Sequence, residues 1–295
     1  MKITFIANPI KTLDSDDSTT EIIKESVKRS HQVYIVERHN IFWKEGELFA
    51  QAINYSNQKI EKIILEKQDV IMMRQDPPFD MDYIYLTYLL EQIKDKTLII
   101  NNPSSVRSAN EKFFILNFQK YIPPTLITKS SEEIKSFLKQ FSEGIILKPL
   151  DNKGGTGIFH IHKNDVNRNE IIKTVTENET KFIMAQKFLK EIKNGDKRVT
   201  ILNGEILNTF VRIPHKEDFR GNLHSGATAK KAKLTEKEVK MVKEIAEKLK
   251  KLGLYLVGLD IIGSHLTEIN VTSPITGHQL FPKVSEEIVN FLENL

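Results

Sequence analysis

The chain has 295 residues, with 43 Lys and Arg against 39 Asp and Glu, so its formal net charge at pH 7 is +4. It contains no cysteine, which excludes a disulfide framework, thiolate zinc sites, iron–sulfur clusters and a cysteine nucleophile. Hydrophobic residues make up 40% of the chain, enough to bury a sizeable core, and the length suits roughly two domains.

The sequence shows no membrane segment or signal peptide. The apolar stretch from Leu254 to Gly263 is far shorter than the about 18 residues that a membrane span requires, and Asp260 interrupts it. The run Ile3–Ala7 is too short for a signal peptide. No Lys/Arg-rich tract carries interleaved aromatic residues. We therefore expect a soluble, cytoplasmic protein that binds neither membranes nor nucleic acid.

In the first third of the chain, strands and helices alternate. Strands are expected at 3–7, 32–36, 69–73 and 97–100, and helices at 19–29 and 81–94. This alternation favours a parallel sheet with helical crossovers. The segment 41–67 has no clear pattern.

The pattern changes around Pro123-Pro124, which should end a helix expected at 110–120. Short strands and hairpins follow, with Asn203-Gly204 as a strong hairpin turn. The expected strands are 144–148, 158–162, 184–189, 198–202, 205–211, 258–262 and 267–271. A helix is expected at 235–252, because Thr235 and Glu238 form a capping box and Gly253 follows the last apolar residue.

A glycine-rich turn runs from Asp151 to Gly157, after a strand that ends in Lys148-Pro149. Neither the Walker pattern nor the Rossmann pattern is present. Glycines let backbone N–H groups approach an anion, so the turn is interpreted as a flap over phosphates, with Lys148 as a point charge. A plain surface hairpin is the alternative.

Three oxygen-bearing side chains are expected to converge near the C-terminus. Strand alternation places Glu268 and Asn270 on one face. If residues 263–265 form the loop, Asp260 lies directly opposite Glu268, with Cβ atoms about 5 Å apart. Mg²⁺, held by few carboxylates and by substrate phosphates, is the natural occupant. The alternative is a polar face exposed to solvent.

Several further polar residues are weaker candidates. Arg74 follows a strand at the sheet edge where ligands bind in open α/β sheets, although it could instead pair with Asp76 in the Pro-Pro turn. Arg212 opens a polar segment, 213–229, that is interpreted as a lid or as a solvated loop. His160 and His162 share a strand face and are expected to be exposed, because no third metal ligand is evident.

Together these segments resemble the prokaryotic-type glutathione synthetases, a family of ATP-grasp ligases, over nearly the whole chain. The most specific matches are 73–80, 145–151, 195–199, 220–223, 257–263 and 267–274. The resemblance implies an α/β fold, α+β in part. Its predicted parts are a pre-ATP-grasp parallel-sheet domain at 1–121, a small ATP-grasp subdomain with the flap at 122–201, and a large ATP-grasp subdomain with the metal site and the lid at 202–295.

The resemblance also implies roles for individual residues. ATP would be bound by Lys112, Lys148, Asp151, Gly154, Gly155, Gly157, Gln186, Lys187, Phe188, Leu189 and Asp196. Within this set, residues 186–189 would form the hinge that contacts the adenine, and Asp196 would contact the ribose. The peptide substrate and the intermediate would be held by Arg74, Arg220, Asn222 and Ser273, with Arg198 and Arg212 in catalytic positions. Mg²⁺, or alternatively Mn²⁺, would be bound by Asp260, Glu268 and Asn270.

The implied reaction couples γ-glutamylcysteine to glycine through an acyl phosphate, in a homo-oligomer that would be a tetramer. The sequence departs from the family at Asn152 in the flap, at 226–228 in the lid, and at Ile275 before a shorter tail. The tail region helps to bind the acceptor in the family, so a ligase with a different amino-acid acceptor is the main alternative. A non-catalytic nucleotide-binding protein is the other.

Overall fold

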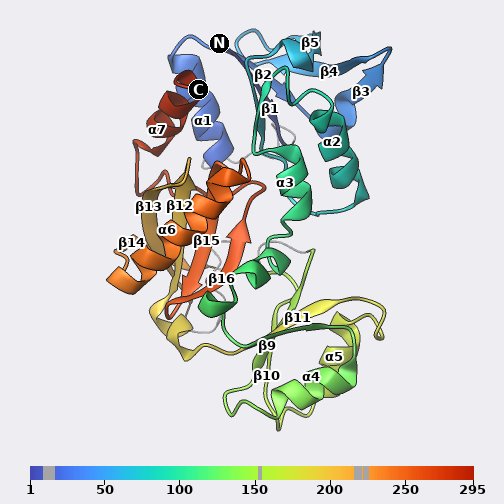
Figure 1. Ribbon diagram of the computed structural model, residues 1–295, viewed down its shortest axis with the longest axis vertical. Helices are drawn as coiled ribbons and strands as arrows, with labels where there is room; N and C mark the ends of the chain where they lie inside the picture. Colours follow the sequence, from blue (N-terminus) through green and yellow to red (C-terminus); the bar gives the residue numbers. More distant parts are fainter. Residues whose placement is uncertain (9–16, 152–154, 216–220, 222–225) are drawn as a thin grey trace.

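The structure is a computed structural model that describes residues 1–8, 17–151, 155–215, 221 and 226–295. Three β-sheets follow one another along the longest axis of the molecule (Figure 1). The sheet formed last in the sequence lies between the other two. The mixed α/β class predicted from the sequence is confirmed.

The first sheet has the strand order β3-β4-β2-β1-β6-β7, with β5 also paired to β4. Its parallel part contains the four predicted strands, which start and end within two residues of the expected bounds. They are β1 (Lys2–Ile6), β2 (Gln32–Val36), β6 (Val70–Met73) and β7 (Leu98–Ile100). The predicted parallel sheet is therefore confirmed for this part.

The unassigned segment 41–67 forms an antiparallel extension of the same sheet. It consists of β3 (Ile41–Lys44), β4 (Glu47–Asn54) and β5 (Ile60–Ile64). In β4 the alternate residues Leu48, Ala50 and Ala52 are buried. Two of these three are alanines, which are weak strand formers, so the period-two signal was faint.

Helices cover the first sheet, and one of them comes from the end of the chain. They are α1 (Ser18–Lys28), α2 (Met81–Glu91), α3 (Pro103–Ser108) and α7 (Val284–Glu293). Helix α7 packs beside α1 (Figure 1), and Ile288 and Leu292 share a buried core with Phe5 and Ile22. The last helix of the chain therefore helps to cover the first sheet.

The helix predicted at 110–120 is wrong in type. The segment forms a 3-10 helix, η4 (Phe113–Tyr121), with a non-helical residue at Phe118. The side chain of Asn110 accepts hydrogen bonds from the N–H groups of Lys112 and Phe113, as a helix cap does, so the break at Phe118 and not the start of the segment departs from a regular helix. The other 3-10 helices are η2 (Arg38–Asn40), η3 (Leu65–Lys67) and η5 (Lys190–Asn194).

The second sheet is antiparallel, with the order β10-β9-β11-β8. Its strands are β8 (Thr125–Thr128), β9 (Ile145–Pro149), β10 (Phe159–Ile161) and β11 (Ile183–Lys187). Helices α4 (Ser131–Leu138) and α5 (Arg168–Val175) share its apolar core. Strands β9 and β10 flank the glycine-rich turn, as the sequence predicts.

The third sheet has the order β14-β13-β12-β15-β16. Its strands are β12 (Asp196–Leu202), β13 (Glu205–Ile213), β14 (Thr228–Lys231), β15 (Leu256–Ile262) and β16 (His265–Asn270). Asn203 and Gly204 both have positive φ, as the predicted tight hairpin turn requires. The predicted domain boundary at 201/202 falls inside strand β12, which ends at residue 202. The domain boundaries stay a prediction.

Helix α6 (Glu236–Lys251) packs on this sheet, and its predicted capping box is confirmed. Thr235 accepts a hydrogen bond from the Glu238 N–H, and the Glu238 side chain accepts one from the Thr235 N–H. In the part of the chain that the structure describes, no helix is long and apolar enough to cross a bilayer.

We expect Thr235→Ala to lower the free energy of unfolding by about 1 kcal/mol, because one N–H group at the start of α6 loses its acceptor. Urea denaturation measures this change. Thr235→Ser keeps the hydroxyl and serves as the control, which should stay close to the wild type. Equal midpoints for the alanine and serine variants would contradict the role of the cap.

Candidate active site

One cavity of about 860 Å³ lies where the second and third sheets face each other, with loops of the first domain at its rim. This volume suits a small ligand or cofactor. Fourteen of the residues predicted for the site line it: Lys112, Lys148, Gly155, Gln186, Lys187, Phe188, Leu189, Asp196, Arg198, Arg212, Asp260, Glu268, Asn270 and Ser273.

Strands β15 and β16 place Asp260 opposite Glu268, as the sequence predicts. The loop, however, is shorter than expected. Ile262 pairs with His265, so only Gly263 and Ser264 turn the chain, both with positive φ. A register shift between Asp260 and Ile261 then restores the predicted pairing.

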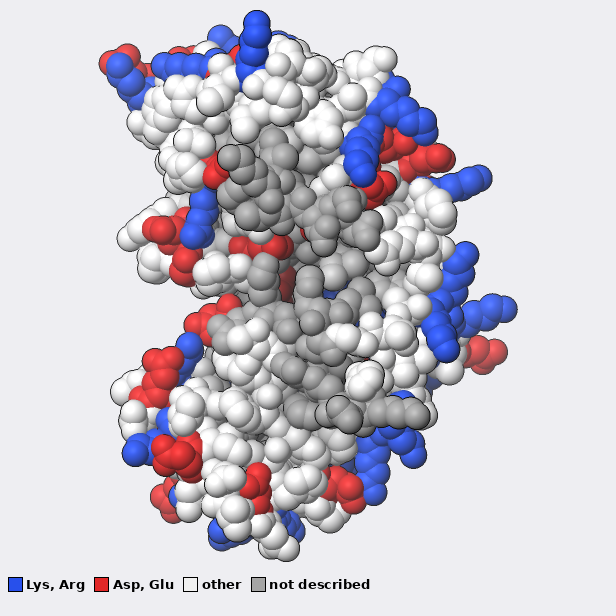
Figure 2. All heavy atoms as spheres, turned by 180° about the vertical axis from the view of Figure 1, so that it is seen from behind, with Lys and Arg blue, Asp and Glu red and all other residues white. Residues whose placement is uncertain are grey.

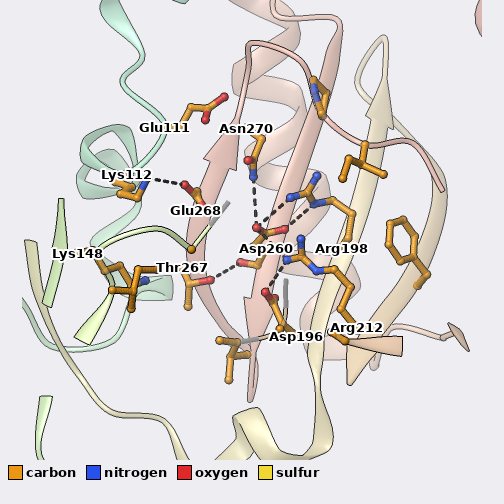
Figure 3. A pocket seen from close by; sticks show the side chains of 18 of the residues that line it. Glu111, Lys112, Lys148, Asp196, Arg198, Arg212, Asp260, Thr267, Glu268 and Asn270 are labelled. Atoms are coloured by element: carbon orange, nitrogen blue, oxygen red, sulfur yellow. Dashed lines mark hydrogen bonds and ion pairs between the residues drawn. The ribbon is translucent and has the colours of Figure 1, made fainter. Parts of the chain in front are cut away.

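Two arginines hold the Asp260 carboxylate at the centre of the cavity (Figure 3). Arg198 is its cross-strand neighbour and binds it bidentately, at 2.5 Å from Nε to Oδ1 and 3.0 Å from Nη2 to Oδ2. Arg212 lies 3.0 Å from Oδ2. Burial would raise the pKa of Asp260, but the two guanidinium groups outweigh it and hold the pKa well below the usual range.

Gly258 makes room for this arrangement. A Cβ atom at this position would lie 3.0 Å from Cδ and Nη1 of Arg198 and 3.1 Å from Cβ of Pro274. A side chain here would have to displace Arg198 or Pro274, so glycine at position 258 favours the path of Arg198 across β15 to Asp260.

Asp196 faces the same cluster from β12. Its Oδ2 accepts a hydrogen bond from Nη2 of Arg212, its cross-strand neighbour. Burial raises the pKa of Asp196 to about 7, because desolvation and the charge of Asp260 outweigh the attraction of Arg212. Among the described residues, none provides a partner for its buried Oδ1. The ribose contact of Asp196 stays a prediction.

Glu268 and Asn270 complete the predicted metal-binding set. Glu268 forms an ion pair with buried Lys112 at 3.1 Å, and the Asn270 amide donates to Oδ2 of Asp260 at 3.3 Å. Burial alone would lower the pKa of Lys112, but Glu268 and Glu111 raise it overall. Within the described ranges, no group of three or more His, Cys, Asp or Glu residues suits a metal. The candidate set is two carboxylates and one amide, which are hard oxygen donors of the kind that Mg²⁺ accepts alongside phosphates.

Sequence reasoning gave no positioning role to Glu111, next to Lys112. Its Oε1 accepts hydrogen bonds from the N–H groups of Val271 and Thr272 and from the Thr272 hydroxyl. These bonds fix the chain directly after Asn270, between β16 and Ser273. Short-range pattern does not reveal this contact, because it joins residues about 160 positions apart.

The predicted adenine hinge follows β11. The N–H groups of Lys187 and Phe188 donate to Pro124 and Gly144. Among the residues that the structure describes, the Leu189 N–H has no partner, so it is the hinge donor available to a base.

The Phe188 ring stacks on His160, with centroids 3.9 Å apart, and Nε2 of His160 lies 2.8 Å from the Glu143 carbonyl. The expected exposure of both histidines is thus wrong for His160, which is half-buried, and confirmed for His162. The ring that covers His160 comes from a residue that follows another strand, so the pattern within the histidine strand does not predict its burial.

Some predicted site residues lie elsewhere. Asp151 pairs with Lys181 at 3.0 Å, and neither Asp151 nor Gly157 lines the cavity. Arg74 is buried behind the cavity wall and donates to the Thr19 hydroxyl and the Pro274 carbonyl. Gly154, Arg220 and Asn222 lie outside the described residues.

Comparisons with known proteins agree with this geometry. Residues 1–107 match the model of the N-terminal domain of prokaryotic glutathione synthetase, and residues 111–283 match that of its ATP-grasp domain. The chain belongs to the prokaryotic glutathione synthetase family. The resemblance drawn from the sequence motifs is therefore confirmed.

Curated members of this family are similar over most of their length. The glutathione synthetase of Nitrosomonas europaea is 40% identical over 290 residues, covering 93% of this chain and 90% of that protein. The glutathione synthetase of Escherichia coli O6:H1 is 40% identical over 287 residues, with the same two coverages.

Solved structures confirm the ATP-grasp fold. D-cycloserine synthetase has a TM-score of 0.71 at 12% identity, covering 98% of this chain and 99% of that one. An ATP-grasp ligase from Chryseobacterium gregarium, solved with ADP and a leader and core peptide, has a TM-score of 0.70 at 15% identity, covering 99% and 96%.

We expect Asp260→Asn to lower the free energy of unfolding by about 3 kcal/mol, because buried Arg198 would lose its counter-charge and Arg212 would keep only Asp196. Guanidinium denaturation without ligands measures this change. Glu247→Gln is the matched control, since Glu247 pairs with Lys251 on the exposed face of α6 and should leave the midpoint unchanged. An unchanged midpoint for Asp260→Asn would show that the arginines do not depend on this carboxylate.

Proposed function

We propose that this chain is a glutathione synthetase that joins γ-glutamylcysteine to glycine with ATP, giving glutathione, ADP and phosphate. The observation that carries the proposal is the convergence of two lysines, two arginines and the Asp260–Glu268–Asn270 set in one cavity. The family match over both domains supports the same reaction.

The described charges suit a triphosphate. Lys112, at the start of η4, and Lys148, on β9, both line the cavity and would bind phosphate oxygens as point charges. Mg²⁺, or alternatively Mn²⁺, would be held by Asp260, Glu268 and Asn270, and when bound it offsets the phosphate charge. The Leu189 N–H would bind the base, and Asp196 the ribose.

The reaction needs no enzyme nucleophile. The cysteinyl carboxylate oxygen attacks the γ-phosphorus, and the bond to ADP breaks. The glycine amine then attacks the acyl carbon, loses a proton, and phosphate leaves. Catalysis is positioning and charge neutralisation, while a closed cavity keeps water from the acyl phosphate.

Arg212 is suited to stabilise the tetrahedral oxyanion. Its Nη2 is held by Asp196 and Asp260, and among the described residues its buried Nε has no partner. One N–H donor is therefore held in a fixed direction without a partner. At other oxyanion sites, one such donor stabilises the transition state by about 3 kcal/mol. Arg198 would support Asp260 during the reaction.

The substrate side of the cavity is formed by the segment after β16. Ser273 and Ile275 line it, and the Thr276 N–H donates to the Ser18 hydroxyl at 3.0 Å, which ties this segment to α1. Ser273 would hold the peptide substrate, together with Arg220 and Asn222, and Arg74 would support this wall of the cavity from behind through its bond to the Pro274 carbonyl. Because Ile275 lies at the cavity, an amine acceptor other than glycine is the second candidate.

The proposal extends to assembly and location. Small-molecule substrates are the expected partners, and the enzyme would be a homo-oligomer, a tetramer by resemblance, that acts in the cytoplasm where ATP and Mg²⁺ are present. Figure 2 shows one face, on which the described Lys and Arg side chains are interspersed with Asp and Glu. Nucleic acid and membranes are not expected partners.

The deciding test is a product assay with γ-glutamylcysteine, Mg·ATP and a panel of amines. Glycine should stimulate both ADP release and glutathione formation. If another amine stimulates turnover and glycine does not, the acceptor assignment fails while the ligase chemistry stands. Absence of ADP release with every amine, despite Mg·ATP binding by calorimetry, would favour a non-catalytic protein.

We expect Glu268→Gln to reduce kcat about a hundredfold and to raise the Mg²⁺ concentration needed for half-maximal rate, because one anionic oxygen is lost from the metal set. Initial rates over a Mg²⁺ titration measure both effects. Glu247→Gln again serves as the control. Product formation with an unchanged Mg²⁺ dependence would refute the metal role of Glu268.

A further inference from the structure

The two lysines of the cavity have different partners. Lys112 is ion-paired with Glu268. Lys148, on β9, donates instead to a neutral acceptor, Oε1 of Gln186 on β11, at 2.7 Å. Gln186 is 2% exposed, and among the described residues no carboxylate lies within ion-pair distance of Lys148.

The amide of Gln186 is held from its other side. Its Nε2 donates to the Thr125 hydroxyl on β8 at 3.0 Å, and that hydroxyl donates to the Pro123 carbonyl at 2.7 Å. Thr125 lies directly opposite Gln186 in the antiparallel register. The chain of bonds thus crosses three neighbouring strands, β8, β11 and β9.

This chain of bonds has only one direction. The Pro123 carbonyl can only accept, so the Thr125 hydroxyl donates its proton to that carbonyl and accepts a hydrogen bond from Gln186. The Gln186 amide must then turn its N–H groups toward Thr125 and its oxygen toward Lys148. A flipped amide would set its N–H group against the Lys148 ammonium and leave two donors facing each other.

A neutral acceptor has a specific electrostatic effect. It restrains the flexible lysine stem, which otherwise loses much rotamer entropy on binding. It also leaves the positive charge and two further N–H donors of Lys148 for a ligand. A carboxylate at position 186 would restrain the lysine equally well but would cancel the charge that a phosphate needs.

We propose that Gln186 is a positioning residue that aims Lys148 at the nucleotide phosphates, and that Thr125 fixes the orientation of the Gln186 amide. The inference rests on the proposed ATP-binding role of Lys148. It assigns the Gln186 side chain a task separate from the backbone contacts of the hinge, and it assigns Thr125 a task that the sequence motifs did not suggest.

A double-mutant cycle tests this proposal, with Mg·AMP-PNP binding measured by calorimetry on the full chain. Gln186→Leu should weaken binding about tenfold, equivalent to about 1.4 kcal/mol, and Lys148→Met should weaken it more. Because Gln186 acts through Lys148, adding Gln186→Leu to Lys148→Met should cause no further loss.

Two further pairs of variants separate positioning from packing. Thr125→Val keeps the side-chain shape but removes the acceptor for the amide and should weaken binding, whereas Thr125→Ser keeps the hydroxyl and should match the wild type. Gln186→Glu keeps an oxygen near Lys148 but should also weaken binding, since its charge pairs with the lysine and repels phosphate. Thermal unfolding checks that each variant folds. If Gln186→Leu does not fold, the comparison of Thr125→Val with Thr125→Ser decides the proposal.

The outcomes are distinct. If Gln186→Leu weakens binding equally in the Lys148→Met background, Gln186 acts directly on the nucleotide or on the fold, and the proposal is overturned. Equal affinities for Thr125→Val and Thr125→Ser would remove Thr125 from the relay. If Lys148→Met leaves binding unchanged, the phosphate role of Lys148 itself fails, and Gln186 has nothing to position.

Discussion

The structure around the cavity depends on one buried carboxylate. Asp260 is held by Arg198 and Arg212, and these three residues come from neighbouring strands of the same sheet. A buried charge cluster is costly unless every member is paired. The pairing here depends on the β12–β15 register and is favoured by the missing side chain at Gly258, while the register shift in β15–β16 sets Glu268 opposite the same carboxylate. The backbone of the third sheet therefore determines where these charged side chains lie, and the charged side chains line the cavity.

The cations around this centre are committed to different degrees. Arg198 is bound through two donors, Arg212 is shared between Asp196 and Asp260, and Lys112 is paired with Glu268. Lys148, by contrast, donates to an amide oxygen and has no carboxylate in ion-pair distance within the described part of the chain. The arginines on the third sheet thus contact carboxylates directly, whereas the lysine on the second sheet contacts a neutral group. An anionic ligand would be drawn toward the side of the flap.

The sequence predicted those features that local periodicity or turn chemistry determines. The parallel strands, helix α6 with its capping box and the Asn203-Gly204 turn are of this kind. The pairing of Asp260 with Glu268 was also predicted, although from a loop one residue too long, and the register shift compensated for the error. The motifs were enough to identify the family.

Contacts between distant residues were not predictable: Arg198 and Asp260 are 62 positions apart, and only the register of their strands reveals the pair. His160 is half-buried because the ring of Phe188, which follows another strand, stacks on it. Segment 41–67 was not recognised as strands because two of the buried residues in β4 are alanines.

Helix α7 has a consequence for how the molecule assembles. Its apolar residues Ile288 and Leu292 complete a core begun by Phe5 and Ile22, so the cover of the first sheet is discontinuous in sequence. During synthesis, the first sheet leaves the ribosome long before the last helix that covers it. The ATP-grasp sheets can form in the meantime, because their pairings lie within residues 125–270. Domains usually fold in the order in which they are made, but here the core beside the first sheet is completed only when nearly the whole chain has been made.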